Sequence, residues 1–247
     1  MTHFASRRPA VFALSTVLLA LVIISLLNAG LGYLKLSPLA RQLITEAVFC
    51  AYVAVLLTSL RWWRESGFRR PISRRKLFVC LPLLLLPVLM LVSGGIKPAS
   101  PGQVMGFAIL ALMIGFAEEG LVRGLAIRAM LPTGLLRAAL LSSLFFGMGH
   151  LINVGQGASF AATGVQVIEA IFLGIGVAGM SLYTGSIWPA IALHSLIDFI
   201  DGGSRGFVLA PPQVVTLIVL VPMIVTGLFA AYGWWLLKGT TTRQPAA

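Results

Sequence analysis

Residues 10–29, AVFALSTVLLALVIISLLNA, decide the class of fold to which this chain belongs. The stretch has no charged side chain. As a helix it is long enough to cross the roughly 30 Å hydrocarbon core of a bilayer, which takes about 20 residues. Across the whole chain 58% of the residues are hydrophobic and 10% are charged, against about 25% charged residues in ordinary soluble domains. We therefore predict an integral membrane protein.

Similar apolar runs recur along the rest of the chain, and only the seventh is short for a crossing. We expect an all-α, polytopic transmembrane bundle of about eight spans, because helices satisfy their own backbone polar groups inside lipid. The fourth span is expected to continue as helix through the charged segment Glu118–Arg128. The expected spans are 10–29, 43–60, 77–94, 102–118, 138–153, 164–183, 187–200 and 214–237.

The basic start Met1–Arg8, followed by an apolar stretch, imitates a secretory signal peptide. The apolar core of such a peptide has about 7 to 15 residues, and the stretch Ala10–Leu27 is longer than that. We therefore expect these residues to be retained as the first transmembrane helix.

The basic residues predict how the chain is oriented. With the N-terminus inside, 14 of the 18 basic residues fall on the cytoplasmic side, in agreement with the positive-inside rule. Loop 61–76, RWWRESGFRRPISRRK, mixes tryptophans with seven positive charges and suits a surface of anionic headgroups. Because the basic residues lie between apolar runs, the net charge of +11 does not indicate a nucleic-acid partner. We expect cytoplasmic termini, contact with membrane lipids, and a multi-pass protein of a bacterial plasma membrane.

Ionisable residues inside the apolar runs are the candidates for function, because each costs a few kcal/mol on insertion scales. Adjacent Glu118 and Glu119 end the fourth span, and Arg123 follows Glu119 by four residues on the same helical face. We expect Arg123 to keep Glu119 ionised, which leaves Glu118 to face a different space and act as a base. The alternative is an interfacial salt bridge with a spare charge.

Two further spans carry histidines. Phe146 and His150 share a helix face, and Gly147 and Gly149 between them allow close approach of another backbone or of a substrate. A second pair, His194-x-x-x-Asp198, lies on one face of the seventh span, and this spacing can orient an imidazole or bind a metal. Taken alone, each motif could equally be a hydrogen-bonded structural pair.

Polar groups from three spans are expected to meet in one interior cavity, because that arrangement is the least costly in lipid. Two imidazoles with carboxylates suit either a zinc site that activates water or metal-free general acid–base hydrolysis. The sequence has no Gly-x-Ser-x-Gly elbow and no His-Glu-x-x-His helix, and neither Cys50 nor Cys80 lies near a histidine in sequence. Two other intramembrane glutamates, Glu46 and Glu169, are expected to be structural or to line a substrate path.

The three motifs, in this order and each on a membrane helix, resemble the CPBP intramembrane protease family. This family includes the type II CAAX prenyl endopeptidases and the Abi-type bacteriocin-immunity proteins. The resemblance extends from about Gly106 to Phe199 and includes Tyr183–Ala190. The motifs are Glu118-Glu119-x-x-x-Arg123, Phe146-x-x-x-His150 and His194-x-x-x-Asp198.

The resemblance implies an endopeptidase that hydrolyses a peptide bond of a peptide or lipidated protein near the membrane surface. It implies that Glu118 and His150 activate a water, while His194 and Asp198 stabilise the oxyanion. Glu119, Arg123 and Phe146 are the supporting residues.

One position departs from the family pattern. The CAAX-processing members have asparagine where this chain has Asp198, and an ionised aspartate cannot donate a hydrogen bond to an oxyanion. Asp198 is then protonated, or orients His194, or belongs to the shell of a metal ion. The resemblance leaves open whether Zn²⁺ is required, with Glu118, His150 and His194 as the ligands that would hold it.

The expected organisation has three parts. Residues 1–100 form the first three helices with the basic loop 61–76, residues 101–200 form the protease-like core, and residues 201–247 form the last helix and a tail. Two other classes of function stay open. In a noncatalytic scaffold or immunity protein, motif variants would lose stability rather than rate. A proton-coupled transporter would show proton flux without proteolysis, although the sequence has no evident inverted repeat.

Overall fold

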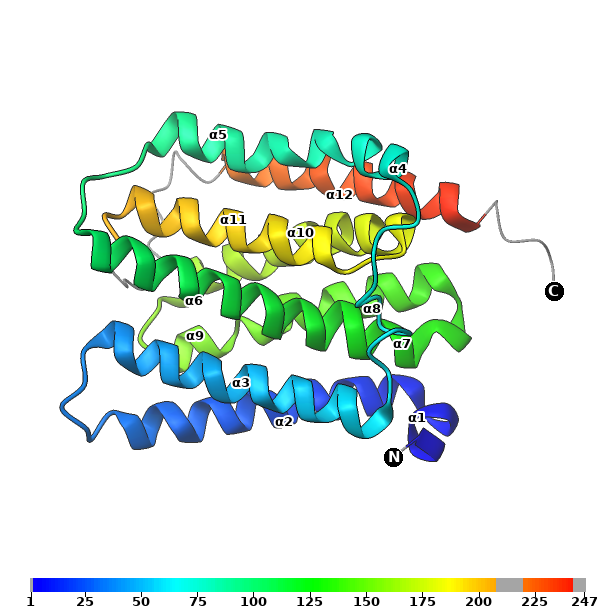
Figure 1. Cartoon of the computed structure of the whole chain (residues 1–247), viewed down its shortest axis with the longest axis horizontal. Coiled ribbons are helices and arrows are strands. Elements are labelled where there is room, and N and C mark those ends of the chain that lie inside the picture. The colour runs from blue at the N-terminus through cyan, green and yellow to red at the C-terminus, as the bar shows by residue number, and fades with distance from the viewer. Residues whose placement is uncertain (1, 208–219, 242–247) are drawn as a thin grey trace.

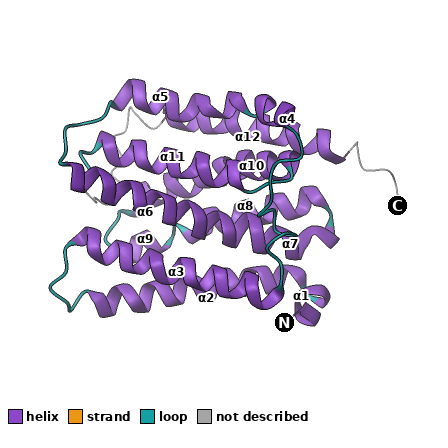
Figure 2. Ribbon diagram, in the orientation of Figure 1, coloured by secondary structure: helices purple, strands orange, loops and turns teal. Residues whose placement is uncertain are grey.

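The structure, a computed structural model, describes residues 2–207 and 220–241, which form a bundle of roughly parallel helices (Figure 1). Within these described residues there is no strand, so the all-α prediction is confirmed (Figure 2). The helices are α1 (Thr2–Arg7), α2 (Pro9–Leu31), α3 (Pro38–Leu60), α4 (Arg74–Val79), η1 (Leu81–Leu84), α5 (Leu85–Gly94), α6 (Pro101–Glu119), η2 (Gly120–Ala126), α7 (Ile127–Met130), η3 (Leu131–Thr133), α8 (Leu135–Gly149), α9 (Ile152–Gly155), α10 (Phe160–Thr184), α11 (Trp188–Ser204) and α12 (Leu220–Thr241).

Five helical segments within the described residues are long and apolar enough to cross a membrane. Leu81–Gly94 is a shorter apolar helix, and α11 has 17 residues, as the short seventh run predicts. Of the last expected span, 214–237, residues 214–219 lie outside the described residues, as do residues 242–247 of the expected tail. The exact number of crossings therefore stays a prediction. The five segments are Pro9–Leu31, Pro38–Leu60, Pro101–Thr133, Leu135–Gly155 and Phe160–Thr184.

The connections between helices gather at two opposite ends of the bundle (Figure 1). One end holds α1, loop 61–73, the turn between α7 and α8, and the end of α12. We call it the basic end, because it carries the cationic residues Arg7, Arg8, Arg61, Arg64, Arg69, Arg70, Arg74, Arg75, Lys76, Arg128, Arg137 and Lys238. The other, the far end, holds the connections 32–37, 95–100, 150–159 and 205–207, and it carries Lys35, Arg41, Lys97 and Arg205.

Arg123 is one of the 14 basic residues that the orientation prediction counts on the cytoplasmic side. Its side chain is inside the bundle, with the residue 4% exposed. The helix predicted to continue through Glu118–Arg128 is present, because α6 continues without a break as the π-helical segment η2 and then as α7. Such π-helical insertions are rare and are frequently found at functional sites.

Serine side chains begin three helices at the far end. Ser37, Ser100 and Ser159 each accept a hydrogen bond from a backbone N–H three residues later. The N-cap bond satisfies one of the free amides of the first helical turn and stabilises a helix by about 1 kcal/mol. These caps set where α3, α6 and α10 begin.

Two glycines let helices approach closely around the polar residues. A Cβ atom on Gly115 of α6 would lie 3.0 Å from the carbonyl oxygen of Ile191 on α11. A Cβ atom on Gly147 of α8 would lie 2.7 Å from the carbonyl oxygen of Val167 on α10. The close approach expected at Gly147 is thus confirmed, and the contact at Gly115 brings α6 against α11 one turn before the adjacent glutamates.

Candidate active site

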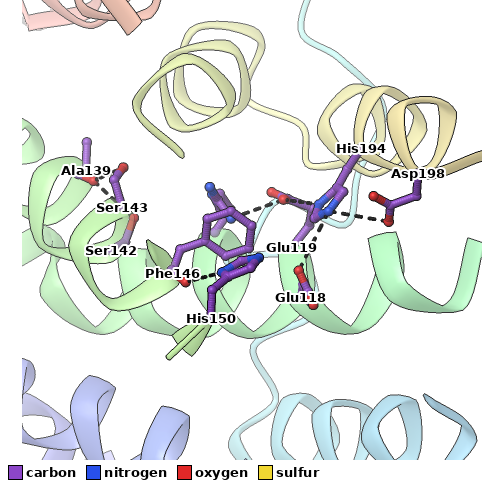
Figure 3. Close-up of polar contacts among 10 residues, drawn as sticks. Glu118, Glu119, Ala139, Ser142, Ser143, Phe146, His150, His194 and Asp198 are labelled. Atoms are coloured by element: carbon purple, nitrogen blue, oxygen red, sulfur yellow. Dashed lines mark hydrogen bonds and ion pairs between the residues drawn. The ribbon is translucent and has the colours of Figure 1, made fainter. Parts of the chain in front are cut away.

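His194 lies at the centre of a buried polar network between α6 and α11 (Figure 3). Its Nδ1 atom is 2.8 Å from Oε1 of Glu119, and the same oxygen accepts a hydrogen bond from Nη1 of Arg123 at 3.1 Å. Because Glu119 accepts a hydrogen bond from a guanidinium, we treat it as a carboxylate. It then also accepts a hydrogen bond from the N–H of the imidazole. The predicted pairing of Arg123 with Glu119 is confirmed, and both side chains are 0% exposed.

The other ring nitrogen of His194, Nε2, faces two carboxyl groups. It lies 3.6 Å from Oε2 of Glu118 and 3.6 Å from Oδ2 of Asp198. Both distances are longer than a direct hydrogen bond, and a water molecule between the groups would bridge them. The Glu118 and Asp198 side chains are each 29% exposed, so they face open space while Glu119 does not.

His150 approaches the same space from the end of α8 (Figure 3). Its Nδ1 atom is 3.0 Å from the carbonyl oxygen of Phe146 and can donate to it, which leaves Nε2 unengaged by that bond. The ring of Phe146 is edge-on to both imidazoles, with centroid distances of 5.1 Å to His150 and 5.8 Å to His194. The guanidinium carbon of Arg123 lies 4.1 Å from the centre of the Phe146 ring, a cation–π contact. Phe146 therefore packs between the two histidines.

One cavity of about 710 Å³ contains the candidate residues. Its walls include Glu118, His150, His194 and Asp198, which come from α6, the end of α8 and α11. The convergence of polar residues from three spans is thus present in the structure, while their catalytic roles stay predictions. Glu119 is behind the wall and supports the residues that line it. Gly149 has open space where a Cβ atom would lie and is part of the cavity wall.

Glu46 of α3 also lines this cavity, and sequence reasoning ranked it below the three motifs. The residue is 6% exposed, and its Oε1 accepts a hydrogen bond from Gln42 at 3.0 Å. Its Oε2 has no hydrogen-bond partner among the described residues. The sequence signal was its place as a glutamate inside an apolar run, which predicts a structural or path-lining residue, and its spacing of four from Gln42 places both on one helix face. Glu169 is not among the residues that line the cavity.

The arrangement does not fit a preformed zinc site. Among the described residues, no three His, Cys, Asp or Glu side chains are placed to hold one metal ion. The Nδ1 atoms of His194 and His150 are engaged with Glu119 and a backbone carbonyl, which leaves the two Nε2 atoms as the ring nitrogens that a ligand could reach. The expected ligand set of Glu118, His150 and His194 is therefore not assembled around one point, and the need for zinc stays a prediction.

Comparison with known proteins gives one match. The family model described as type II CAAX prenyl endopeptidase Rce1-like matches residues 100–200, the part of the chain that holds all three motifs. Comparisons with curated proteins and with solved structures gave no match. The matched range agrees with the resemblance expected from about Gly106 to Phe199. Residues 100–200 are therefore similar to the Rce1-like family of type II CAAX prenyl endopeptidases, in agreement with the resemblance carried by the three motifs.

Proposed function

We propose that this protein is an intramembrane endopeptidase that hydrolyses a peptide bond with a water activated by Glu118 and His150. One observation carries the proposal. In a chain with 10% charged residues, the carboxyl groups of Glu118 and Asp198 line one cavity inside the helical bundle together with the imidazoles of His150 and His194. Intramembrane ionisable residues are costly, and groups that share a cavity are usually kept there for function. The family match over residues 100–200 supports peptide-bond hydrolysis as that function.

The proposed reaction begins with a proton transfer. Glu118, which faces the cavity, takes a proton from water while the oxygen attacks the carbonyl carbon of the substrate. His150 holds the same water through Nε2. The carbon–nitrogen bond then breaks as Glu118 returns the proton to the leaving nitrogen. One new carboxyl group and one new amino group result, and the atoms of one water are consumed.

His194 stabilises the oxyanion in this proposal. Glu119 accepts a hydrogen bond from the N–H at Nδ1 of His194, and this bond fixes the orientation and the tautomer of the ring. When Nε2 also carries a proton, the imidazolium donates a hydrogen bond from Nε2 to the oxyanion in the cavity. Asp198, 3.6 Å from Nε2, then balances the positive charge instead of donating a hydrogen bond itself. One role considered for Asp198 was to orient His194, and in this proposal Glu119 has that role instead.

The test uses purified protein in lipid vesicles with two internally quenched peptides, one farnesylated at a CAAX-type C-terminus and one identical but unmodified. We expect cleavage of at least one peptide, with one heavy oxygen in the new carboxyl terminus when the reaction runs in H₂¹⁸O. Glu118→Ala and His150→Ala should abolish cleavage while insertion and folding are kept, and Glu169→Gln serves as the matched control. Wild-type rates in both motif variants would overturn the proposal. Loss of folding in the variants, with no cleavage by the wild type, would favour a scaffold or immunity role.

A further inference from the structure

A cluster of four aromatic side chains packs loop 61–73 against α6 and the start of α11. We call this cluster the aromatic plug; it consists of Trp63, Phe68, Phe116 and Trp188. The ring of Phe68 lies at its centre, 5.0 Å from Trp63, 5.7 Å from Phe116 and 5.6 Å from Trp188 between centroids. Phe116 precedes Glu118 by two residues on α6. Trp63 and Phe68 belong to loop 61–73, so the plug joins this loop to α6 and α11 near the active-site glutamates.

Loop 61–73 is fastened across this end by hydrogen bonds to the connection between α10 and α11. The N–H of Ile187 donates to the carbonyl oxygen of Gly67 at 2.9 Å. The N–H of Ile72 donates to the carbonyl oxygen of Thr184 at 3.0 Å, and the hydroxyl of Ser186 donates to the carbonyl oxygen of Arg69 at 2.6 Å. No residue of loop 61–73 lines the active-site cavity. The active-site cavity therefore does not extend into this loop.

The cavity extends instead to the far end. Its walls contain residues next to the connections at that end, in the last turn of α2, the first turn of α3, the loop before α10 and the end of α11. These residues are Asn28, Arg41, Gln156, Asp201 and Arg205. Gln156 is exposed and also lines the cavity, so the cavity is open there. A continuous space thus joins the catalytic groups to the far end.

The dimensions and walls of this passage suit an extended peptide. From His194 to Arg205 along α11 is about 16 Å at a rise of about 1.5 Å per residue. An extended chain covers that length with about five residues, at about 3.3 Å each. Amide side chains line the route, including Asn28, Gln42 and Gln166. Side-chain amides can both donate to and accept from a peptide backbone, whereas a prenyl chain can use neither group.

We propose that the cavity receives an extended peptide segment of about five residues from the non-cytoplasmic side of the membrane. The inference rests on the proposed peptidase function and on the orientation that the basic residues predict. Because the basic end is cytoplasmic in that orientation, the cavity does not extend into the loop on the cytoplasmic face, and the far end opens outward. The substrate class is then a peptide or protein tail exposed outside the cytoplasm, and a cytoplasmic lipidated C-terminus does not reach the site.

The test measures from which side a thiol in the passage can be reached, and it needs no substrate. Three single-cysteine variants are made in a Cys50→Ala, Cys80→Ala background: Gln156→Cys at the opening, Glu118→Cys at the bottom, and Arg64→Cys in loop 61–73 as the control. Right-side-out and inverted vesicles from the expressing cells are treated with the membrane-impermeant reagent 2-(trimethylammonium)ethyl methanethiosulfonate, and the modified fraction is measured by mass spectrometry.

We expect Gln156→Cys and Glu118→Cys to react in right-side-out vesicles and to be protected in inverted ones, with Arg64→Cys showing the opposite pattern. Adding Phe68→Ala to Glu118→Cys should abolish the protection in inverted vesicles, because the centre of the plug is removed. Reaction of Glu118→Cys only in inverted vesicles, or in neither preparation, overturns the inference. Since labelling does not depend on cleavage, a failure here is separate from a failure of the Glu118→Ala and His150→Ala cleavage test.

Discussion

The two histidines of the candidate active site are held in very different ways. On the side of α6 and α11, His194 is 5% exposed and bonded to Glu119, which is itself paired with Arg123. On the side of α8, His150 is half-buried, and the hydrogen bond found for its ring is the one to the carbonyl oxygen of Phe146. The difference indicates that one imidazole is fixed in advance, whereas the other can adjust to water and substrate.

This contrast separates the residues that support the fold from the residues that act in the reaction. Removing one member of a buried ion pair leaves an uncompensated charge and costs about 3–5 kcal/mol. Losing one ordinary hydrogen bond costs about 1 kcal/mol. Substitutions in the network of α6 and α11 should therefore unfold the protein as well as inactivate it. Substitutions of the groups that face the cavity should lower the rate and leave the fold intact.

Arg123→Met should give the largest effect, because it leaves the buried carboxylate of Glu119 without its guanidinium partner. We expect a loss of about 3–5 kcal/mol in stability together with loss of cleavage. Thermal unfolding of the detergent-purified protein measures the first, and vesicle cleavage measures the second. Arg128→Met is the control, because that guanidinium lies over the ring of Trp62 rather than against a carboxylate. An unchanged unfolding temperature in Arg123→Met would show that the network does not support the fold.

Glu118→Gln should lower the cleavage rate by about 10²–10⁴, the usual contribution of a general base, with the unfolding temperature unchanged. The side chain is 29% exposed, and its nearest ionic partner is 3.6 Å away, so little structure depends on its charge. The rate is measured in vesicles and the stability in detergent. A large fall in unfolding temperature with a proportionate fall in rate would assign Glu118 to the structural half of the site.

His150→Gln should lower kcat by about 10²-fold, because Glu118 still acts as base without its partner. The loss of the bond to the Phe146 carbonyl should cost only about 1 kcal/mol. Steady-state kinetics with the cleaved peptide and thermal unfolding check the two parts. If kcat is kept and only KM rises, His150 binds substrate and does not act on the water.

Asp198→Asn should have the smallest effect and leave the rate within about tenfold of wild type. The amide can donate directly to an oxyanion, which offsets the loss of the charge that supports the His194 imidazolium. Asp198→Ala, which can do neither, should be slower than Asp198→Asn in the same vesicle assay. Equal rates for the alanine and asparagine variants would remove Asp198 from the oxyanion side of the site.

Much of this site could be predicted from the sequence because its motifs use helical spacing. Residues four apart share a face, so the pairing of Glu119 with Arg123 and of Phe146 with His150 follows from position alone. The buried position of Arg123 could not be predicted, since a charged segment gives no sign that a π-helical turn will keep it inside the bundle. Residue spacing also could not predict that Glu46 shares one cavity with the three motifs, because this depends on where α3 lies against α6.

The attachment of loop 61–73 to the connection between α10 and α11 could not be predicted from the sequence for a similar reason. Loop 61–76 was predicted only as a surface that contacts headgroups, because its composition favours that interpretation. The contacts that fasten it join residues far apart in the chain, such as Gly67 with Ile187. Local composition does not report such contacts.

A double-mutant cycle for Glu118 and His150 tests most directly whether the two halves of the site act on one water. Cleavage rates are measured in vesicles for Glu118→Gln, His150→Gln and the combined variant, with stability checked in detergent. If both groups serve one water, the combined variant should be about as slow as Glu118→Gln alone, because the second substitution removes a contribution that is already lost. Rate losses that multiply, so that the combined variant is slower by the product of the two single effects, would contradict a shared water.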